Sequence, residues 1–124
     1  MDENIKNLTM DDVLDIIGKF PWKPSFNKVI ITLNMVAEDG DLQLSNTMVD
    51  EIQYVVAAGE MAEKQFPAGS KIFLDLEKMM FKVPDPQDQT QVIHQIKLEP
   101  IVVDEVTYAI IEDRLIKAKY IGNE

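Results

Sequence analysis

The chain has 124 residues, enough for one domain with a core of its own. Its 12 basic and 22 acidic residues give a formal net charge of −10, which argues against nucleic acid as a partner because phosphate contacts need clustered Lys and Arg. The absence of cysteine excludes disulfides, thiolate zinc sites and a thiol nucleophile.

Residues 1–27 are expected to form a short helix followed by an extended arm. Thr9 suits the N-cap of the helix, and Asp12 suits its positive end. Apolar residues then follow at helical spacing as far as Gly18, after which two prolines hold the chain extended. The resulting N-terminal docking surface consists of Met10, Val13, Leu14, Ile17, Phe20 and Trp22. It would pack either on its own domain or on a neighbouring subunit.

Residues 28–124 contain short segments rich in β-branched and aromatic residues between turn signals, a pattern typical of a small barrel or sandwich. The first segment, Lys28–Leu33, is apolar at nearly every position, so we expect it to be buried on both faces or at a subunit boundary. Ile52–Ala58 and Lys71–Leu76 flank a stretch broken by proline and glycine, and we expect them to pair in one antiparallel sheet. Pro84–Gln91 is expected to be an exposed loop. Further strands are expected at Glu77–Val83, Val92–Leu98, Ile101–Val103, Thr107–Ile111 and Leu115–Ile121.

Few residues have a pattern that indicates catalysis or metal binding. The only histidine, His94, lies in an expected strand and is interpreted as structural, because a base or metal ligand needs convergent partners. No serine lies in Gly-x-Ser-x-Gly, and no glycine-rich phosphate-binding motif occurs. The carboxylates of Asp39 and Asp41 fit an acidic turn better than a calcium loop. We therefore expect no catalytic residues, no metal site and no cofactor, in a protein that is not an enzyme.

Five segments occur in an order that has a parallel in a known family. They are Lys28–Leu33, Gly40–Ser45, Glu51–Gly59, Phe66–Leu74 and Tyr108–Ala118. In this order they resemble the first strand, mobile loop, second strand, following turn and terminal element of GroES-type co-chaperonins. The resemblance covers roughly Lys28–Tyr120 with gaps. It implies an all-β fold in which residues 28–124 form a small irregular GroES-like β-barrel, preceded by the short N-terminal helix and extended arm of residues 1–27.

The resemblance also implies a partner. In the family, an apolar tripeptide of the mobile loop enters a groove on the chaperonin, and the co-chaperonin caps the folding chamber. The matching positions here are Gly40, Leu42, Gln43 and Leu44. Leu42 and Leu44 match the outer positions of the tripeptide, and Gln43 replaces the apolar residue between them. The implied function is that of a non-enzymatic, oligomeric co-chaperonin.

A ring of identical subunits follows from the same resemblance, because in the family the last strand pairs with the first strand of the next subunit. Here those strands are Leu115–Ile121 and Lys28–Leu33, and a neighbouring copy would complete their open edges. The subunit-interface residues would be Val29, Ile31, Leu33, Ile116, Ala118 and Tyr120. In the last strand we expect Ile116, Ala118 and Tyr120 to face one side and the intervening lysines the other.

Two additions distinguish the chain from ordinary members of the family, Met1–Asn27 and Pro84–Glu99. Such divergent co-chaperonins resemble those carried by bacteriophages, which also reuse small β-barrels as capsid or connector parts. The alternative function is therefore that of a virion structural protein, whose N-terminal docking surface contacts capsid or connector proteins. The sequence has neither a secretion-signal pattern nor an apolar run of roughly 20 residues, so we expect no membrane partner and a location in the cytoplasm or the virion.

Overall fold

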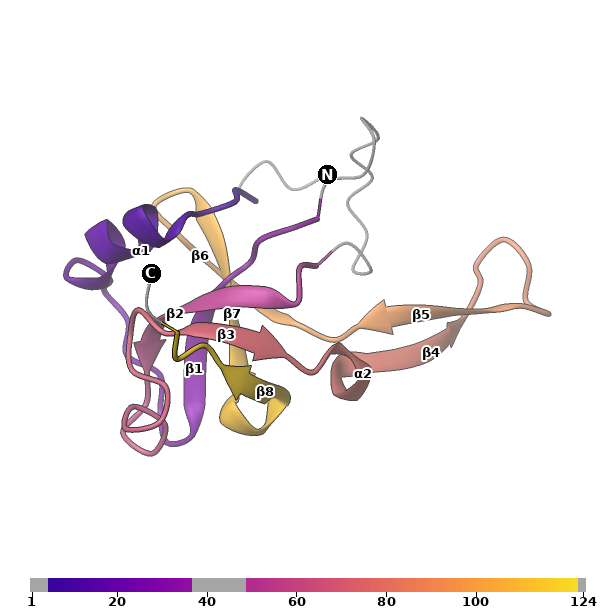
Figure 1. Ribbon diagram of the computed structural model, residues 1–124. Helices are drawn as coiled ribbons and strands as arrows, with labels where there is room; N and C mark the ends of the chain where they lie inside the picture. The colour runs from indigo at the N-terminus through magenta and orange to yellow at the C-terminus, as the bar shows by residue number, and fades with distance from the viewer. Residues whose placement is uncertain (1–4, 37–48, 123–124) are drawn as a thin grey trace.

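The computed structural model describes residues 5–36 and 49–122, and its largest element is a six-stranded sheet with the order β6-β7-β1-β2-β3-β8 (Figure 1). All neighbouring strands in it run antiparallel. The bounds are β1 Lys28–Thr32, β2 Ile52–Ala58, β3 Lys71–Leu74, β6 Glu99–Val103, β7 Val106–Glu112 and β8 Ile116–Lys119. The prediction of a mostly β protein is confirmed. Among the described strands the sheet is open, with β6 and β8 at its edges.

Within residues 5–36 and 49–122, the remaining elements are two helices, a 3₁₀ helix and a hairpin. They are α1 Met10–Ile17, α2 Leu76–Met79, β4 Met80–Pro84, β5 Val92–Ile96 and the 3₁₀ helix η2 Asp113–Leu115. β4 and β5 pair only with each other, and this hairpin projects away from the six-stranded sheet (Figure 1). Glu77–Val83 was expected to be a strand throughout. Its first part is instead helical, because the side chain of Asp75 caps a helical turn by accepting from the backbone N–H of Lys78 at 3.3 Å.

Helix α1 begins at a capping box and packs on the sheet of its own chain. Thr9 Oγ1 accepts from the backbone N–H of Asp12 at 3.2 Å, and the Asp12 carboxylate accepts from the N–H of Thr9 at 2.9 Å. Val13 is fully buried in a cluster with Ile30 of β1 and Val56 of β2. Of the two alternatives for this helix, the structure therefore shows packing on its own domain.

Strand β1 lies inside the sheet, between β2 and β7. Val29 and Ile31 are fully buried on one face, and Ile30 is buried on the other, under α1. The prediction that this strand is buried on both faces is confirmed. The prediction that Val29, Ile31 and Leu33 contact a neighbouring subunit is wrong, because both backbone edges of β1 are paired within the chain and all three side chains belong to its core.

Strand β8 is an edge strand, as expected for the last strand, but its side chains do not alternate as predicted. Ile116 is buried in the core, whereas Ala118 and Tyr120 are exposed. The reason is a shift in register against β3, where Phe73 pairs with Ala118 but the next residue, Leu74, pairs with Ile116. The extra residue in β8 puts Ile116 on the opposite side of the sheet from Ala118 and Tyr120.

Strands β2 and β3 pair antiparallel, as expected from their sequences. The chain turns between them at Pro67–Ser70, where the backbone N–H of Ser70 donates to the carbonyl of Pro67 at 3.0 Å. Gly69 occupies the third position of this turn with a φ of 95°, a conformation that side chains disfavour.

Candidate partner-binding site

The predicted partner-binding residues Gly40, Leu42, Gln43 and Leu44 lie outside the described residues. The chain on both sides of residues 37–48 is described, and its two ends meet. Met35 and Val49 form an isolated antiparallel bridge, and the backbone N–H of Asp50 donates to the carbonyl of Asn34 at 2.9 Å. We call these four residues the root. The root holds the ends of the predicted binding segment side by side.

One buried side chain, that of Gln53 in β2, connects both sides of the root. Its Oε1 accepts from Thr32 Oγ1 at 2.7 Å and from the backbone N–H of Asn34 at 2.8 Å. Its Nε2 donates to the carbonyl of Asn34 at 2.9 Å and to that of Asp50 at 2.8 Å. These four bonds use the full hydrogen-bonding capacity of the amide. Asn34 and Asp50 of the root are therefore tied to a buried side chain of the sheet.

An irregularity between β1 and β2 makes this arrangement possible. Ile30 pairs with Ala57, but the next residue, Ile31, pairs with Val55, so the register shifts by one residue. Beyond the shift, the hydroxyl oxygen of Thr32 accepts from the backbone N–H of Tyr54 at 3.0 Å, where a regular ladder would have a backbone carbonyl as the acceptor. The bulge thus replaces ladder bonds by side-chain bonds at the point where Gln53 enters the core.

The N-terminal segment is attached to the same root through two asparagines. The side chain of Asn34 accepts from the backbone N–H of Leu8 at 2.8 Å and donates to its carbonyl at 3.0 Å. Asn7 makes the same pair of bonds with the backbone of Met35, at 2.8 and 3.0 Å. Since Thr9 follows directly and caps α1, these bonds link the helix to the root. Sequence reasoning missed both asparagines, because nothing local indicates their distant backbone partners.

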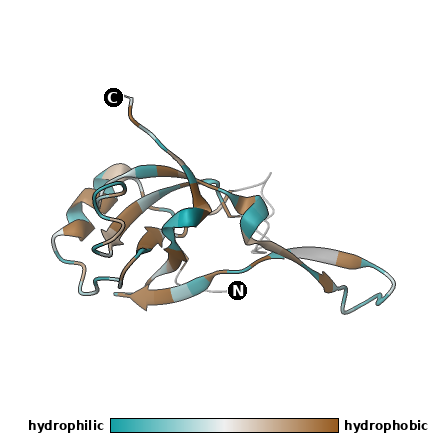
Figure 2. Cartoon of the chain, turned by 90° about the horizontal axis from the view of Figure 1, so that it is seen from below, coloured by the Kyte–Doolittle hydropathy of each residue, from teal (hydrophilic) through white to brown (hydrophobic). Residues whose placement is uncertain are grey.

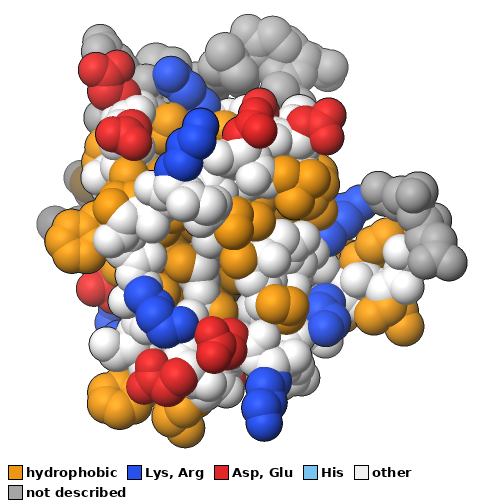
Figure 3. All heavy atoms as spheres, turned by 90° about the vertical axis from the view of Figure 1, so that its left-hand side faces the viewer, with side chains coloured by type: hydrophobic (Ala, Val, Ile, Leu, Met, Phe, Trp, Pro, Cys, Tyr) orange, Lys and Arg blue, Asp and Glu red, His pale blue; other side chains and the backbone are white. Residues whose placement is uncertain are grey.

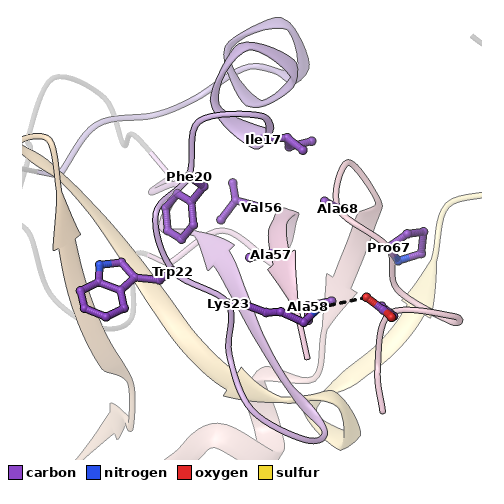
Figure 4. Close-up of a pocket in the computed structure, with 10 residues that line it drawn as sticks. Ile17, Phe20, Trp22, Lys23, Val56, Ala57, Ala58, Pro67 and Ala68 are labelled. Atoms are coloured by element: carbon purple, nitrogen blue, oxygen red, sulfur yellow. Dashed lines mark hydrogen bonds and ion pairs between the residues drawn. The ribbon is translucent and has the colours of Figure 1, made fainter. Parts of the chain in front are cut away.

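Three residues of the predicted N-terminal docking surface line a hollow of about 340 Å³ on the side of the sheet covered by α1 (Figure 4). Ile17, Phe20 and Trp22 lie on one side of it, with Val56, Ala57, Ala58, Pro67 and Ala68 also among the lining residues. The ring of Phe20 meets that of Tyr108 edge to face, with centroids 5.1 Å apart. Phe20 is therefore engaged mainly within its own chain.

The six residues of the N-terminal docking surface do not share one exposed face. Val13 is fully buried, Ile17 and Phe20 are half-buried against the sheet, and Met10 is half-buried. Leu14 and Trp22 are each 59% exposed. Figure 3 views the molecule from the α1 end, where apolar side chains are interspersed with charged ones. Only Leu14 and Trp22 present large apolar areas to a partner.

The outer face of β3 and β8 forms a second, smaller feature, a groove of about 240 Å³. Its walls include Ala118 and Tyr120 of the predicted subunit interface, together with Ile52 and Phe73. The ammonium of Lys117 lies 4.7 Å from the centre of the Phe73 ring, and that of Lys71 lies 4.9 Å from the centre of the Tyr120 ring. The structure thus brings Ala118 and Tyr120 together at the β8 edge and leaves Ile116 in the core.

The described parts of the chain contain no group of three or more His, Asp or Glu side chains placed to hold a metal ion. No helix within residues 5–36 and 49–122 is both long and apolar enough to span a bilayer. His94 lies in β5, opposite Lys82 of β4. In comparisons with known proteins, no family model and no curated protein sequence matches the chain.

Proposed function

We propose that the protein is a non-catalytic, oligomeric co-chaperonin that caps a chaperonin ring, with a small irregular GroES-like β-barrel as its fold. Residues 40–44 bind the chaperonin, with Leu42 and Leu44 as the apolar contacts. The observation that supports this proposal is the root, in which the buried side chain of Gln53 joins Asn34 to Asp50 through three hydrogen bonds and is held by a fourth from Thr32.

A fixed root matters because binding segments work best when a rigid scaffold positions them. Holding both ends of residues 37–48 together removes part of the chain entropy that a partner would otherwise have to restrict on binding. The N-terminal segment adds to this support through Asn7, and α1 in turn anchors the N-terminal segment to the sheet. Residues 40–44 can therefore vary in sequence while their attachment to the domain stays fixed.

Self-association in this proposal uses the two edges of the sheet, since β1 is paired on both sides. β8 carries Lys117 and Lys119, whereas the open strand β6 begins at Glu99 and is followed by Asp104 and Glu105. Opposite charges on the two edges favour a head-to-tail contact in which β8 of one copy extends the sheet at β6 of the next. Head-to-tail contacts of this kind close into a ring when the rotation between copies permits it.

The proposal is tested by capture on an immobilised chaperonin ring with and without ATP. The wild-type protein should bind in a nucleotide-dependent way, and Leu42→Asp should abolish capture without changing the urea unfolding curve. Leu14→Asp is the matched control, because Leu14 is an exposed leucine of α1 outside the binding segment. Wild-type protein that ignores the chaperonin in both conditions, or Leu42→Asp that binds normally, would refute the proposal.

The alternative, a virion structural protein, is favoured by the exposure of Leu14 and Trp22. Removing the whole N-terminal segment would be a poor test. Val13 belongs to the core, and its loss would expose the buried face of the sheet beneath α1 and destabilise the protein. The double variant Leu14→Ser/Trp22→Ser is sharper. If this function holds, co-assembly with capsid or connector proteins is lost in the double variant and kept in Leu42→Asp, the reverse of the pattern expected for a co-chaperonin.

A further inference from the structure

The β4–β5 hairpin receives little support from its own chain. Five residue pairs join its strands, but of the hairpin side chains that the structure describes only Ile96, at its base, is buried in the core, next to Met79 at the end of α2. Farther out, Phe81 is 42% exposed and Val92 is 59% exposed, and apolar residues occur along the projecting strands (Figure 2). A two-stranded hairpin alone is marginally stable in water. Its exposed apolar side chains and unpaired outer edges indicate a surface that a partner completes.

The tip of the hairpin holds two carboxylates in place. The carboxylate of Asp88 accepts from the backbone N–H of Thr90 at 3.1 Å and from its hydroxyl at 2.6 Å, and these bonds lower the pKa of Asp88. The carboxylate of Asp85 accepts from the backbone N–H of Gln87 at 2.9 Å. The sequence has no Lys or Arg between Pro84 and Gln91. The tip therefore carries two negative charges and no positive one.

A groove of about 860 Å³ lies at the other end of the hairpin, where the base of the hairpin meets β6 and β7. Its basic lining residues are Lys28, Lys78, Lys97 and Arg114. They are a third of the 12 basic residues of the chain, and among the described residues Glu99 and Glu112 are the acidic ones that line the same groove. Arg114 is paired with Glu112 at 3.3 Å, and the ammonium of Lys78 lies 3.8 Å from the carboxylate of Asp75. Apolar residues such as Leu98 and Ile110 form the rest of its lining. In a protein with a net charge of −10, this groove is a local site for an acidic, partly apolar segment.

The tip and the groove are separated by the length of the hairpin. Five residues of β4 at about 3.3 Å each span about 17 Å. If two copies place their hairpins side by side and antiparallel, each tip lies at the base of the other hairpin, next to its groove. This arrangement has two-fold symmetry, so both contacts form at once.

We propose that the protein forms a two-fold symmetric dimer in which the acidic tip of each hairpin, Asp85 and Asp88, docks in the basic groove of the other copy. A second copy is the partner that fits, because one chain carries both an acidic tip and a basic groove, one at each end of the same hairpin. The docked tip also covers the exposed Phe81, which lines the groove. This contact is independent of residues 40–44.

Charge reversal on each side tests the dimer. Asp85→Lys/Asp88→Lys reverses the tip, and Lys28→Glu/Lys97→Glu reverses two exposed groove lysines. Each variant alone should raise the dimer dissociation constant about tenfold or more, because like charges then meet at both contacts. An equimolar mixture should form the heterodimer, since both of its contacts pair opposite charges again. Native mass spectrometry distinguishes the heterodimer from each parent by mass.

A milder tip variant separates charge from turn structure. Asp85→Asn/Asp88→Asn keeps side-chain oxygens that accept the turn hydrogen bonds and removes only the charges, so it should weaken the dimer less than the lysine variant. If the asparagine variant dimerises as tightly as the wild type, tip charge has no role and the proposal is wrong.

Cross-linking provides a second readout that does not depend on any larger assembly. The natural chain has no cysteine, so Gln87→Cys in the tip and Lys97→Cys in the groove can be introduced singly and mixed under mild oxidation. A disulfide should join the two different copies. Gln87→Cys mixed with Lys64→Cys is the control, because Lys64 is exposed in the connection between β2 and β3. Equal cross-linking of Gln87→Cys to Lys97→Cys and to Lys64→Cys would overturn the proposal. So would a wild-type protein that stays monomeric at its highest soluble concentration. Leu42→Asp should dimerise like the wild type even if it no longer binds a chaperonin.

Discussion

The hydroxyl of Thr32 donates a hydrogen bond of 2.7 Å to Oε1 of Gln53, and both side chains are buried. Thr32 is the last residue of β1, and Gln53 belongs to β2, so the bond joins the strands on either side of residues 37–48. Polar groups are stable in a protein core only when their hydrogen bonds are made, so this pair depends on the complete set of bonds around Gln53.

Replacing Gln53 by Leu should destabilise the protein strongly. The change leaves the hydroxyl hydrogen of Thr32, the backbone N–H of Asn34 and the carbonyl of Asp50 without the partners that Gln53 provides, whereas the carbonyl of Asn34 keeps the N–H of Asp50. Thr32 is buried and the other two groups are part-buried, so with a cost of about 1–3 kcal/mol for a buried group left unsatisfied we expect the free energy of unfolding to fall by about 2–4 kcal/mol. Urea unfolding followed by circular dichroism measures this. Gln65→Leu, at an exposed position, should stay within about 0.5 kcal/mol of the wild type.

Val13 and Leu14 should differ sharply, although they are neighbours in α1 and were predicted to share one face. Val13→Ala removes methyl groups from the fully buried contact with Ile30 and Val56, and we expect a loss of roughly 1.5–3 kcal/mol. Leu14→Ala should change stability by less than about 0.5 kcal/mol, because most of that side chain already contacts water. Thermal unfolding of the two variants compares them directly, and equal losses would show that α1 packs differently.

Alanine should be harmful at Gly59 and harmless at Gly18. A Cβ at Gly59 would collide with the backbone carbonyl oxygen of Phe26 and lie 2.9 Å from the carbonyl carbon of Ser25. Because backbone atoms must then move, we expect a loss of about 1–3 kcal/mol. At Gly18 no atom lies within 4 Å of such a Cβ, and the backbone is in the right-handed helical region. Gly18→Ala should be neutral or gain up to about 1 kcal/mol in urea unfolding.

Stability should decline in alkaline solution because of Tyr108. Burial raises the pKa of this phenol, and the nearby charge of Asp104 raises it further. Below the ordinary tyrosine pKa of about 10, the hydroxyl is protonated in both the folded and the unfolded chain, so its contribution is constant. Above that pH the unfolded chain releases the proton first, and the free energy of unfolding falls until the pH passes the folded-state pKa.

Urea unfolding between pH 9 and 11 measures this effect. Tyr108→Phe should reduce the decline, and its ring can keep the edge-to-face contact with Phe20. Tyr120→Phe is the matched control, because it removes the same hydroxyl from a side chain that is 48% exposed. An equal slope in the wild type and Tyr108→Phe would show that another group causes the alkaline loss.

Local patterns were sufficient for most secondary structure. The β-branched segment at Lys28–Leu33 and the capping signal at Thr9 predicted β1 and α1 close to their observed bounds. Asp75 was the local signal that could have replaced the expected strand at Glu77 by the short helix α2, since aspartate is a strong N-cap. These features depend on residues a few positions apart, which a sequence displays directly.

The register shifts could not be predicted from the sequence. One shift, between Ile30 and Ile31, changes the pairing of β1 with β2 near Gln53, and the other moves Ile116 into the core while Ala118 and Tyr120 stay outside. A strand with alternating side chains fits either register locally, and the choice depends on the strand that lies beside it. For the same reason, the sequence pattern of β1 was compatible with a subunit boundary that the actual pairing with β2 and β7 rules out.

By itself, the sequence determined that this acidic, cysteine-free chain builds short strands behind an N-terminal helix, and it supplied residues 40–44 as a candidate binding segment. Only the tertiary structure decided that Gln53, Asn34 and Asn7 join at the root of that segment, and that an acidic hairpin tip and a basic groove lie at opposite ends of one hairpin. Propensity and capping act over a few neighbouring residues, whereas these contacts join residues up to 28 positions apart or depend on which strands pair. These contacts contribute to the stability of the protein only after the sheet has brought distant segments together.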